Sequence, residues 1–351
     1  MSKTNLCVIF GGVSSEHEIS RLSATTVIKN INKEKYNLHM IMITKSGTWF
    51  YYDGDAQDIV GLRDDEICNF DEAIISPSRK DKGILRFTKD GIVNIPIDVI
   101  IPVLHGKNGE DGTIQGLFEL SGIPYVGSGV IGSSVCMDKC IAKIMFSKAE
   151  IPQAEWVEFK RGENIDAKYI EDKIGYPCFI KPSNAGSSVG VTKAIDNDSL
   201  LSGINLAFEH DYKVLIEEAL TGSEVECSVL GNFEPVCAAA LGEIGMAATF
   251  YDYDAKYKDE NSKTIIPAIL DKNIEAKLKK YALKAYKICE CRGLSRVDFF
   301  VNKETGEIKL NEINTLPGFT SISMYPKMWE KSGVNCSELL DKLINLAQLQ
   351  N

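Results

Sequence analysis

Two stretches near the C-terminus, residues 296–301 and 309–321, alternate polar and apolar side chains, which is the period of a β-strand. The tetrapeptide Lys-Glu-Thr-Gly lies in the gap between them, and this arrangement predicts a hairpin. On such a hairpin Asp298 points to one face, and Glu312 and Asn314 share a face because they are two residues apart. The pattern therefore restricts this part of the chain to a hairpin that carries oxygen-bearing side chains.

These side chains, with Arg296 beside them, suit Mg²⁺ and phosphate. Mg²⁺ takes hard oxygen ligands from one or two carboxylates, while water and substrate phosphates complete its shell. The alternative is a solvated edge with scattered acids. It is less favoured because Leu310, Ile313 and Leu316 indicate a half-buried strand, where an acid is costly unless it is paired or binds a metal.

The length and charge of the whole chain limit its class. A chain of 351 residues suggests two or three domains, and 44% apolar residues allow a sizeable core. The net charge of −10 argues against nucleic acid as a partner. No apolar run reaches the roughly 20 residues of a membrane span. The N-terminus lacks a signal-peptide pattern, so we expect a cytoplasmic protein whose cysteines are free thiols.

The first 130 residues alternate strands and helices, which predicts an α/β unit with a parallel sheet covered on both faces. Residues 5–10 form its first strand, a glycine turn follows, and a helix runs to about Lys29. Backbone N–H groups at such a turn attract anions. Ser15 and Glu18 could form a capping box there, and Glu16 is a further acid, free to meet a cation.

The rest of the chain indicates two α+β units. We expect a compact antiparallel module in the middle, and a final unit that contains the acidic hairpin. The predicted elements are a helix over 136–150, strands at 177–182, 189–194 and 213–218, and helices over 197–209, near 272–288 and near 335–349.

Two loops rich in glycine are candidate ligand-binding segments. His105 ends a buried strand and begins a loop whose glycines let the backbone approach a ligand closely; a core histidine with satisfied partners is an equally good interpretation. Lys181 ends another apolar strand before the Gly/Ser loop 183–188, a combination that fits ATP phosphates although it is not a Walker A loop. Lys139 could supply a second cation, or could simply be solvated.

Further candidates lie beyond this loop. Glu217 and Glu224, at a strand end, could accept hydrogen bonds from the adenine amine and ribose hydroxyls, or could be exposed loop acids. Residues 250–257 are aromatic and charged without apolar periodicity, which is typical of a lid that excludes water.

Taken together, these motifs resemble the D-alanine–D-alanine ligase family of the ATP-grasp superfamily over nearly the whole chain. The matching strings are Gly11-Gly12-Val-Ser-Ser-Glu16, His105-Gly with Gly109-Glu-Asp-Gly112, Met137-Asp-Lys139, Lys181-Pro-Ser with Gly186-Ser-Ser-Val-Gly190, Tyr251-Asp-Tyr-Asp-Ala-Lys-Tyr257, Arg296-Val-Asp298, and Asn311 to Ser323.

The resemblance implies an ATP-grasp fold with an N-terminal parallel-sheet domain over 1–124, a central subdomain over 125–218 and a C-terminal subdomain over 219–351, the last two clamping ATP. It implies D-alanine and ATP as substrates, two Mg²⁺ or Mn²⁺ ions, an acylphosphate intermediate and a homodimer.

The same resemblance implies the site residues. The catalytic group is Glu16, Ser187, Tyr257 and Arg296, with Glu16 pairing with the ammonium of the first D-alanine and Arg296 facing the oxyanion. The substrate-binding group is His105, Gly318, Ser323 and Met324. The ATP-binding group is Lys139, Lys181, Glu217, Glu224 and Lys256. The metal ligands are Asp298, Glu312 and Asn314.

The chain departs from the family pattern beside the second-substrate pocket, where Ile322 and Met324 replace the usual His and Leu. Related ligases join D-alanine to D-serine or D-lactate, and these acceptors stay open as alternatives. An Arg at position 324 would indicate D-serine, whereas Lys256-Tyr257 resembles the D-alanine form. We therefore expect D-alanine as the acceptor.

Overall fold

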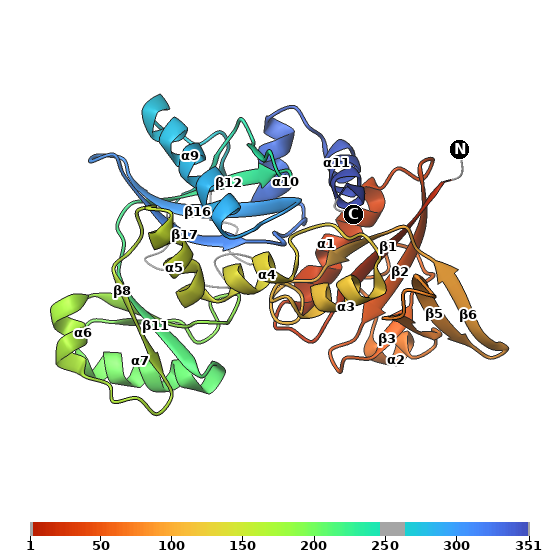
Figure 1. The fold of residues 1–351 in the computed structure, drawn as a ribbon, viewed down its shortest axis with the longest axis horizontal. Helices are drawn as coiled ribbons and strands as arrows, with labels where there is room; N and C mark the ends of the chain where they lie inside the picture. The colour runs from red at the N-terminus through yellow and green to blue at the C-terminus, as the bar shows by residue number, and fades with distance from the viewer. Residues whose placement is uncertain (1–2, 246–263, 350–351) are drawn as a thin grey trace.

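The structure is a computed structural model that describes residues 3–245 and 264–349. These residues form three β-sheets with helices packed against them (Figure 1). The predicted lid segment, with Lys256 and Tyr257, lies outside the described residues.

The N-terminal sheet has seven strands in the order β6-β5-β4-β3-β2-β1-β7. Its strands are β1 (Thr4–Gly11), β2 (Tyr36–Ile43), β3 (Trp49–Tyr51), β4 (Glu72–Ile75), β5 (Gly83–Thr88), β6 (Gly91–Pro96) and β7 (Val99–Val103). The sheet is parallel only where β1 pairs with β2 and β7, and the pairs from β2 to β6 are antiparallel. The prediction of a parallel sheet thus holds for one part. β5 and β6 follow each other through a tight turn, which permits only antiparallel pairing, whereas a parallel pair needs a crossover such as the helix between β1 and β2.

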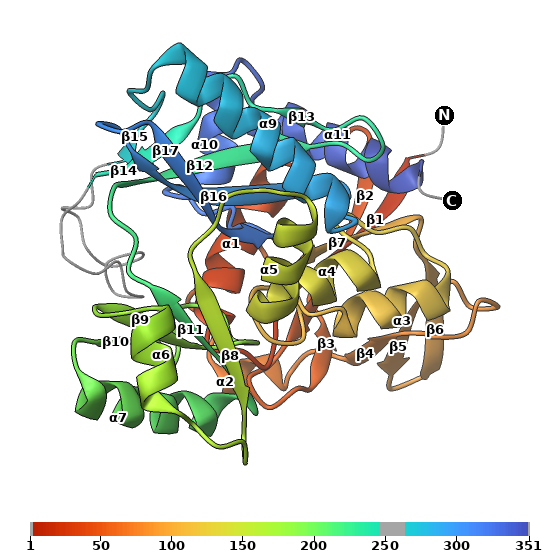
Figure 2. The same ribbon diagram turned by 60° about the vertical axis from the view of Figure 1, so that its left-hand side comes forward.

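Both faces of this sheet are covered. Leu6, Val8 and Phe10 of β1 pack in one core with α1 (His17–Asn30) and α11 (Cys336–Gln348). The alternate residues of β1 pack in a second core with α3 (Thr113–Ser121). The C-terminal helix therefore lies against the first helix of the chain and against β7, as Figures 1 and 2 both show for the two helices. Between β3 and β4 lies the short helix α2 (Asp64–Ile67).

The middle of the chain forms the expected antiparallel module. Its four-stranded sheet has the order β10-β9-β11-β8 and is antiparallel throughout. Its elements are β8 (Trp156–Lys160), α6 (Ala167–Lys173), β9 (Cys178–Pro182), β10 (Thr192–Ala194), α7 (Asn197–His210) and β11 (Lys213–Glu218).

The third sheet has the order β15-β14-β12-β16-β17, with β13 paired to β12. Its strands are β12 (Ser223–Leu230), β13 (Val236–Cys237), β14 (Gly242–Ile244), β15 (Thr264–Ile265), β16 (Leu294–Asn302) and β17 (Glu307–Asn314). It is covered by α9 (Lys272–Ile288), and α10 (Met324–Lys331) contacts β12. The predicted hairpin is confirmed as β16–β17, although its second strand ends at Asn314.

The single helix predicted over 136–150 is wrong in detail. The chain forms α4 (Val130–Met137) and α5 (Lys139–Lys148), and Asp138 between them is the N-cap of α5, accepting a hydrogen bond from the amide of Ile141 at 3.1 Å. Both helices contribute to the core of the third sheet. In Figures 1 and 2, α5 lies between the four-stranded sheet and the third sheet. The exact limits of the predicted subdomains stay a prediction.

Candidate functional site

One face of the third sheet collects acids from neighbouring strands. Asp298 of β16 lies opposite Glu226 of β12 on one side and opposite Glu312 of β17 on the other. Residues two apart in a strand share a face. Glu224 and Asn314 therefore join the same face.

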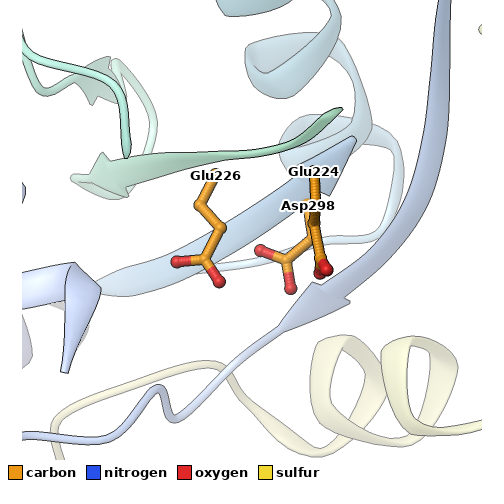
Figure 3. Close-up of side chains that lie close together, drawn as sticks. All are labelled: Glu224, Glu226 and Asp298. Atoms are coloured by element: carbon orange, nitrogen blue, oxygen red, sulfur yellow. The ribbon is translucent and has the colours of Figure 1, made fainter. Parts of the chain in front are cut away.

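Three of these acids converge most closely. Glu224, Glu226 and Asp298 each place one carboxylate oxygen within 4.8 Å of the others (Figure 3). Asp298 is fully buried and Glu226 nearly so. Glu226 was not predicted from the sequence as a member of this group. Its spacing of two residues from Glu224 on a strand was the signal that could have found it.

Arg296 partly balances this negative charge. Its guanidinium donates to both carboxylate oxygens of Asp298, from Nε at 2.8 Å and from Nη2 at 2.7 Å. Its Nε also lies 3.3 Å from Oε1 of Glu226. The Nδ2 atom of Asn314 donates to Oδ2 of Asp298 at 2.9 Å. Asn314, Arg296 and Asp298 are thus brought together as the sequence analysis expected.

The donor set of this face fits a divalent cation. Among the described residues it gathers the carboxylates of Glu224, Glu226, Asp298 and Glu312 beside the guanidinium of Arg296, and carboxylate oxygens are the hard ligands that cations such as Mg²⁺ prefer. Clustering buried carboxylates is costly, and binding of hard cations would offset that cost.

A second cluster of charges lies on the four-stranded sheet. Lys181 of β9 places Nζ 2.6 Å from Oε1 of Glu217 on β11, and Lys143 of α5 places Nζ 2.8 Å from Oε2 of the same carboxylate. Burial alone would raise the pKa of Glu217, but the two lysines lower it to about 2. The acid expected to face adenine is therefore held between two cations. Lys143 was not predicted from the sequence as part of the site.

The Gly/Ser loop after Lys181 folds against α5. Lys139 donates from Nζ to the carbonyl of Ala185 at 2.6 Å, and its backbone N–H donates to the carbonyl of Ser183 at 2.9 Å. Ser187 and Ser188 adopt left-handed backbone angles, with φ of 50° and 57°. Lys139 is thus placed against the loop proposed from sequence for phosphate.

The turn after β1 requires glycine because another part of the backbone passes close to it. Gly11 has φ of +91°, and a Cβ atom there would lie 2.1 Å from the carbonyl oxygen of Ile43. The capping box considered as an alternative for Ser15 and Glu18 does not form: Glu16 is the N-cap of α1, and no side chain caps the helix. Glu18 instead pairs with Lys45 at 2.8 Å.

The carboxylate of Glu16 lies where three segments of the chain meet. A Cβ atom added at Gly106 would lie 2.5 Å from Oε2 of Glu16, and one at Gly186 would lie 2.9 Å from it. The glycines of the His105 loop and of the Gly/Ser loop thus make room for this acid. Glu16 is only 7% exposed. Within residues 3–245 and 264–349, neither its Oε2 nor the buried Oγ of Ser187 has a hydrogen-bond partner.

His105 joins two loops instead of presenting a free ring nitrogen. Its Nδ1 lies 3.0 Å from the carbonyl oxygen of Leu316, which can only accept, so Nδ1 carries the proton. Its Nε2 then accepts from the hydroxyl of Ser23 at 3.0 Å. Burial lowers the pKa of His105, although Glu16 and the Leu316 carbonyl oppose the shift. The ring is therefore a neutral connector beside the site.

Replacing His105 with alanine should lower the free energy of unfolding by about 1–3 kcal/mol, because the buried Leu316 carbonyl loses its donor. Urea unfolding measures this loss. Ser23→Ala should remove part of the same network, so the two losses should not add. An unchanged midpoint in the His105 variant would contradict the connector role.

Glu110 is a second acid that the sequence analysis did not choose. Its Oε2 accepts from the amide of Gly106 at 2.8 Å, and its Oε1 accepts from the amide of Leu316 at 3.2 Å. Burial first, and then the charge of Glu16, raise the pKa of Glu110 to about 8. It supports the same two loops as His105. The string Gly-Glu-Asp-Gly was the available signal.

The residues expected at the second-substrate pocket follow β17. Ser323 Oγ accepts from the amide of Thr320 at 2.9 Å, and a Cβ atom at Gly318 would lie 2.8 Å from that same oxygen. Met324 is 6% exposed and packs over Gly242, whereas Ile322 is 51% exposed. Gly318 and Ser323 are thus adjacent, and Met324 lies mainly in the core.

None of the described helices combines the length and the apolar character needed to cross a membrane.

Comparison with known proteins defines the class of this chain. The families described as D-ala D-ala ligase N-terminus and C-terminus match residues 5–128 and 145–345. The D-alanine–D-alanine ligase of Ruminiclostridium cellulolyticum is 53% identical, over 99% of this chain and 96% of that protein. The VanG D-Ala:D-Ser ligase of Enterococcus faecalis superposes with a TM-score of 0.88 at 42% identity, covering 99% of this chain and 100% of that one. The D-alanine–D-alanine ligase of Bacillus anthracis complexed with ATP superposes with a TM-score of 0.73 at 32% identity, covering 99% of this chain and 97% of that one.

The fold and these neighbours define an α/β ligase with the ATP-grasp architecture. Within that class, the chain belongs to the D-alanine–D-alanine ligase family.

Proposed function

We propose that this protein joins two D-alanine molecules to D-alanyl-D-alanine while converting ATP to ADP and phosphate, as a step in peptidoglycan precursor synthesis. The observation that carries the proposal is the buried Glu16 carboxylate, whose Oε2 lies between two glycine loops without a partner among the described residues. A buried anion is costly without a cation. The ammonium group of the first D-alanine would supply that cation.

The nucleotide would lie between the four-stranded sheet and the third sheet. Lys139 and Lys181 flank the Gly/Ser loop and would contact the phosphates, with Lys256 as a further ATP contact. Glu224 would accept from the ribose hydroxyls, and Glu217 would lie near the adenine. The relative from Bacillus anthracis that binds ATP supports this use of the fold.

Asp298, Glu312 and Asn314 would hold two Mg²⁺ or Mn²⁺ ions, which would offset charge on the transferring phosphoryl group. Glu226 adds a further carboxylate beside them.

The reaction needs two steps because a carboxylate is not attacked by an amine at neutral pH. One carboxylate oxygen of the first D-alanine attacks the γ-phosphorus of ATP, giving an acylphosphate and ADP. The amine of the second D-alanine then attacks the acyl carbon, loses a proton, and phosphate leaves. Arg296 and the amide of Gly318 would stabilise the oxyanion. Ser187 would hold Glu16 together with Tyr257, which lies outside the described residues.

For the second substrate, which accepts the acyl group, there are two candidates. The VanG neighbour is a D-Ala:D-Ser ligase, so D-serine is a specific alternative. We propose D-alanine because position 324 is Met rather than Arg. Ser323 and Met324 would flank the acceptor, and His105 would lie near the carboxylate of the first D-alanine. We also propose a cytoplasmic homodimer with the domain limits 1–124, 125–218 and 219–351.

An acceptor-competition assay tests the function. The protein is incubated with ATP, Mg²⁺ and D-alanine together with D-serine and D-lactate at two pH values, and phosphate and products are measured. D-alanyl-D-alanine should be the main product. Folded protein that forms no dipeptide would refute the ligase activity, whereas mainly D-alanyl-D-serine would refute only the acceptor.

A further inference from the structure

Lys143 is a buried lysine at the junction between the two sheets that would clamp ATP. It lies on α5, its side chain is 3% exposed, and its Nζ lies 2.8 Å from Oε2 of Glu217. The other oxygen of Glu217 lies 2.6 Å from Nζ of Lys181, whose side chain is 17% exposed. One acid is thus shared by a deeply buried lysine and a more accessible one.

The two lysines come from different packing units. α5 belongs to the core of the third sheet, where Ala142 and Phe146 pack with residues of α9. Glu217 and Lys181 lie in the four-stranded sheet, which has a separate core. The Lys143–Glu217 pair therefore crosses from one unit to the other, and only the Lys181–Glu217 pair lies within a single sheet.

The two lysines beside Glu217 differ in whether they can reach a nucleotide. One lysine is enough to neutralise Glu217, so the second cation is in excess. Lys143 is too deeply buried to meet a ligand, whereas Lys181 is the partner that lies next to the Gly/Ser loop. Without Lys143, Lys181 would be the one ion-pair partner left to Glu217 within residues 3–245 and 264–349. Its departure would then leave an uncompensated buried charge.

We propose that Lys143 is a positioning residue that keeps Glu217 neutralised, so that Lys181 can leave this acid and bind the phosphates of ATP. The inference rests on the phosphate contact proposed above for Lys181. Lys143 itself touches neither substrate nor metal in this scheme, and it acts through Glu217.

Binding of a non-hydrolysable ATP analogue with Mg²⁺, measured by calorimetry without D-alanine, tests the proposal. Lys143→Met should weaken binding by about tenfold or more, because Lys181 must then abandon a buried acid. Lys143→Arg keeps the charge and should bind within about threefold of the parent protein. The KM for ATP should rise more than the KM for D-alanine.

A double variant separates this role from a merely structural one. In the Glu217→Gln background there is no acid to neutralise, so Lys143→Met should weaken analogue binding by less than about threefold. This comparison still tests the proposal if Lys143→Met alone fails to fold, because the double variant leaves no unpaired buried charge at this pair. A loss of tenfold or more that persists in the Glu217→Gln background would overturn the proposal, as would normal binding by Lys143→Met.

A matched control breaks another ion pair at the same junction. Lys309 of β17 lies 2.6 Å from Glu218 of β11, so Lys309→Met also removes a link between the two sheets. It should leave analogue binding within about threefold. Lys181→Met distinguishes the two proposals: if it weakens binding and Lys143→Met does not, only the inference about Lys143 fails. If Lys181→Met binds normally, the proposed phosphate contact fails as well.

Discussion

Glu312→Gln is expected to lower kcat by roughly three orders of magnitude, since a lost carboxylate ligand removes several kcal/mol of charge stabilisation from the phosphoryl-transfer step. Glu312 lies opposite Asp298 in the β16–β17 hairpin, on the face that also carries Glu224 and Glu226. Glutamine keeps the size and an oxygen of the side chain but removes its charge. The fold should therefore be retained while the metal-dependent step is lost.

Steady-state phosphate release at several Mg²⁺ concentrations, with thermal unfolding of the same samples, measures this effect. Glu307→Gln is the matched control, because Glu307 begins the same strand but is exposed and pairs only at 3.6 Å with Lys309. It should leave kcat within about twofold of the parent, as expected for an exposed ion pair. A Glu312 variant that retains more than a tenth of the parent rate would contradict the metal assignment.

The sequence was most informative where the signal is local. Alternation of period two predicted the β16–β17 hairpin, and the pairing of Asp298 with Glu312 confirms that the acids on it share a face. Residues 213–218 and 272–288 were also predicted at the limits that the structure gives. In both cases the apolar pattern within one element decides the outcome, so no knowledge of its neighbours was needed.

The predictions were wrong where contacts between distant parts of the chain determine the strand pairing or the limits of a helix. The parallel sheet was predicted from the order of elements, but β3, β4, β5 and β6 extend it as antiparallel strands, with β5 and β6 joined by a tight turn. The helix over 136–150 is divided at Asp138, which accepts one hydrogen bond from the hydroxyl of Ser183 and pairs with Lys213 of the four-stranded sheet. Tertiary contacts of this kind leave no periodic trace in the sequence.

The functional residues that were not predicted also depend on contacts between distant parts of the chain. Glu226 becomes part of the acidic cluster only through its register with Asp298 on another strand. The role of Lys143 follows only from its ion pair with Glu217, which is more than 70 residues away in the sequence. A lysine or glutamate on a single amphipathic element is usually solvated, so each of these residues taken alone suggests an exposed side chain. Their burial, which reverses that interpretation, is a property of the assembled fold.

Glu16→Gln should lower kcat/KM for the first D-alanine by roughly 150- to 5,000-fold, because a buried ammonium that loses its carboxylate partner costs about 3–5 kcal/mol. Binding of the ATP analogue without D-alanine should change by less than about threefold, since the nucleotide contacts proposed here do not include Glu16. The kinetic loss should therefore appear in the KM of the donor D-alanine more than in the affinity for ATP. Initial rates at varied D-alanine, fitted separately for the two D-alanine sites, measure it.

Stability distinguishes this role from a structural one. Glu16 is 7% exposed and its Oε2 has no hydrogen-bond partner in the described part of the chain, so the carboxylate costs free energy as long as no substrate is bound. Removing that charge should leave the melting temperature unchanged or raise it, while activity falls. Glu18→Gln is the control from the same turn, because Glu18 is half exposed and pairs with Lys45; it should alter neither property. A Glu16 variant that melts earlier than the parent but keeps its kcat/KM would show that the acid supports the fold and does not bind the donor.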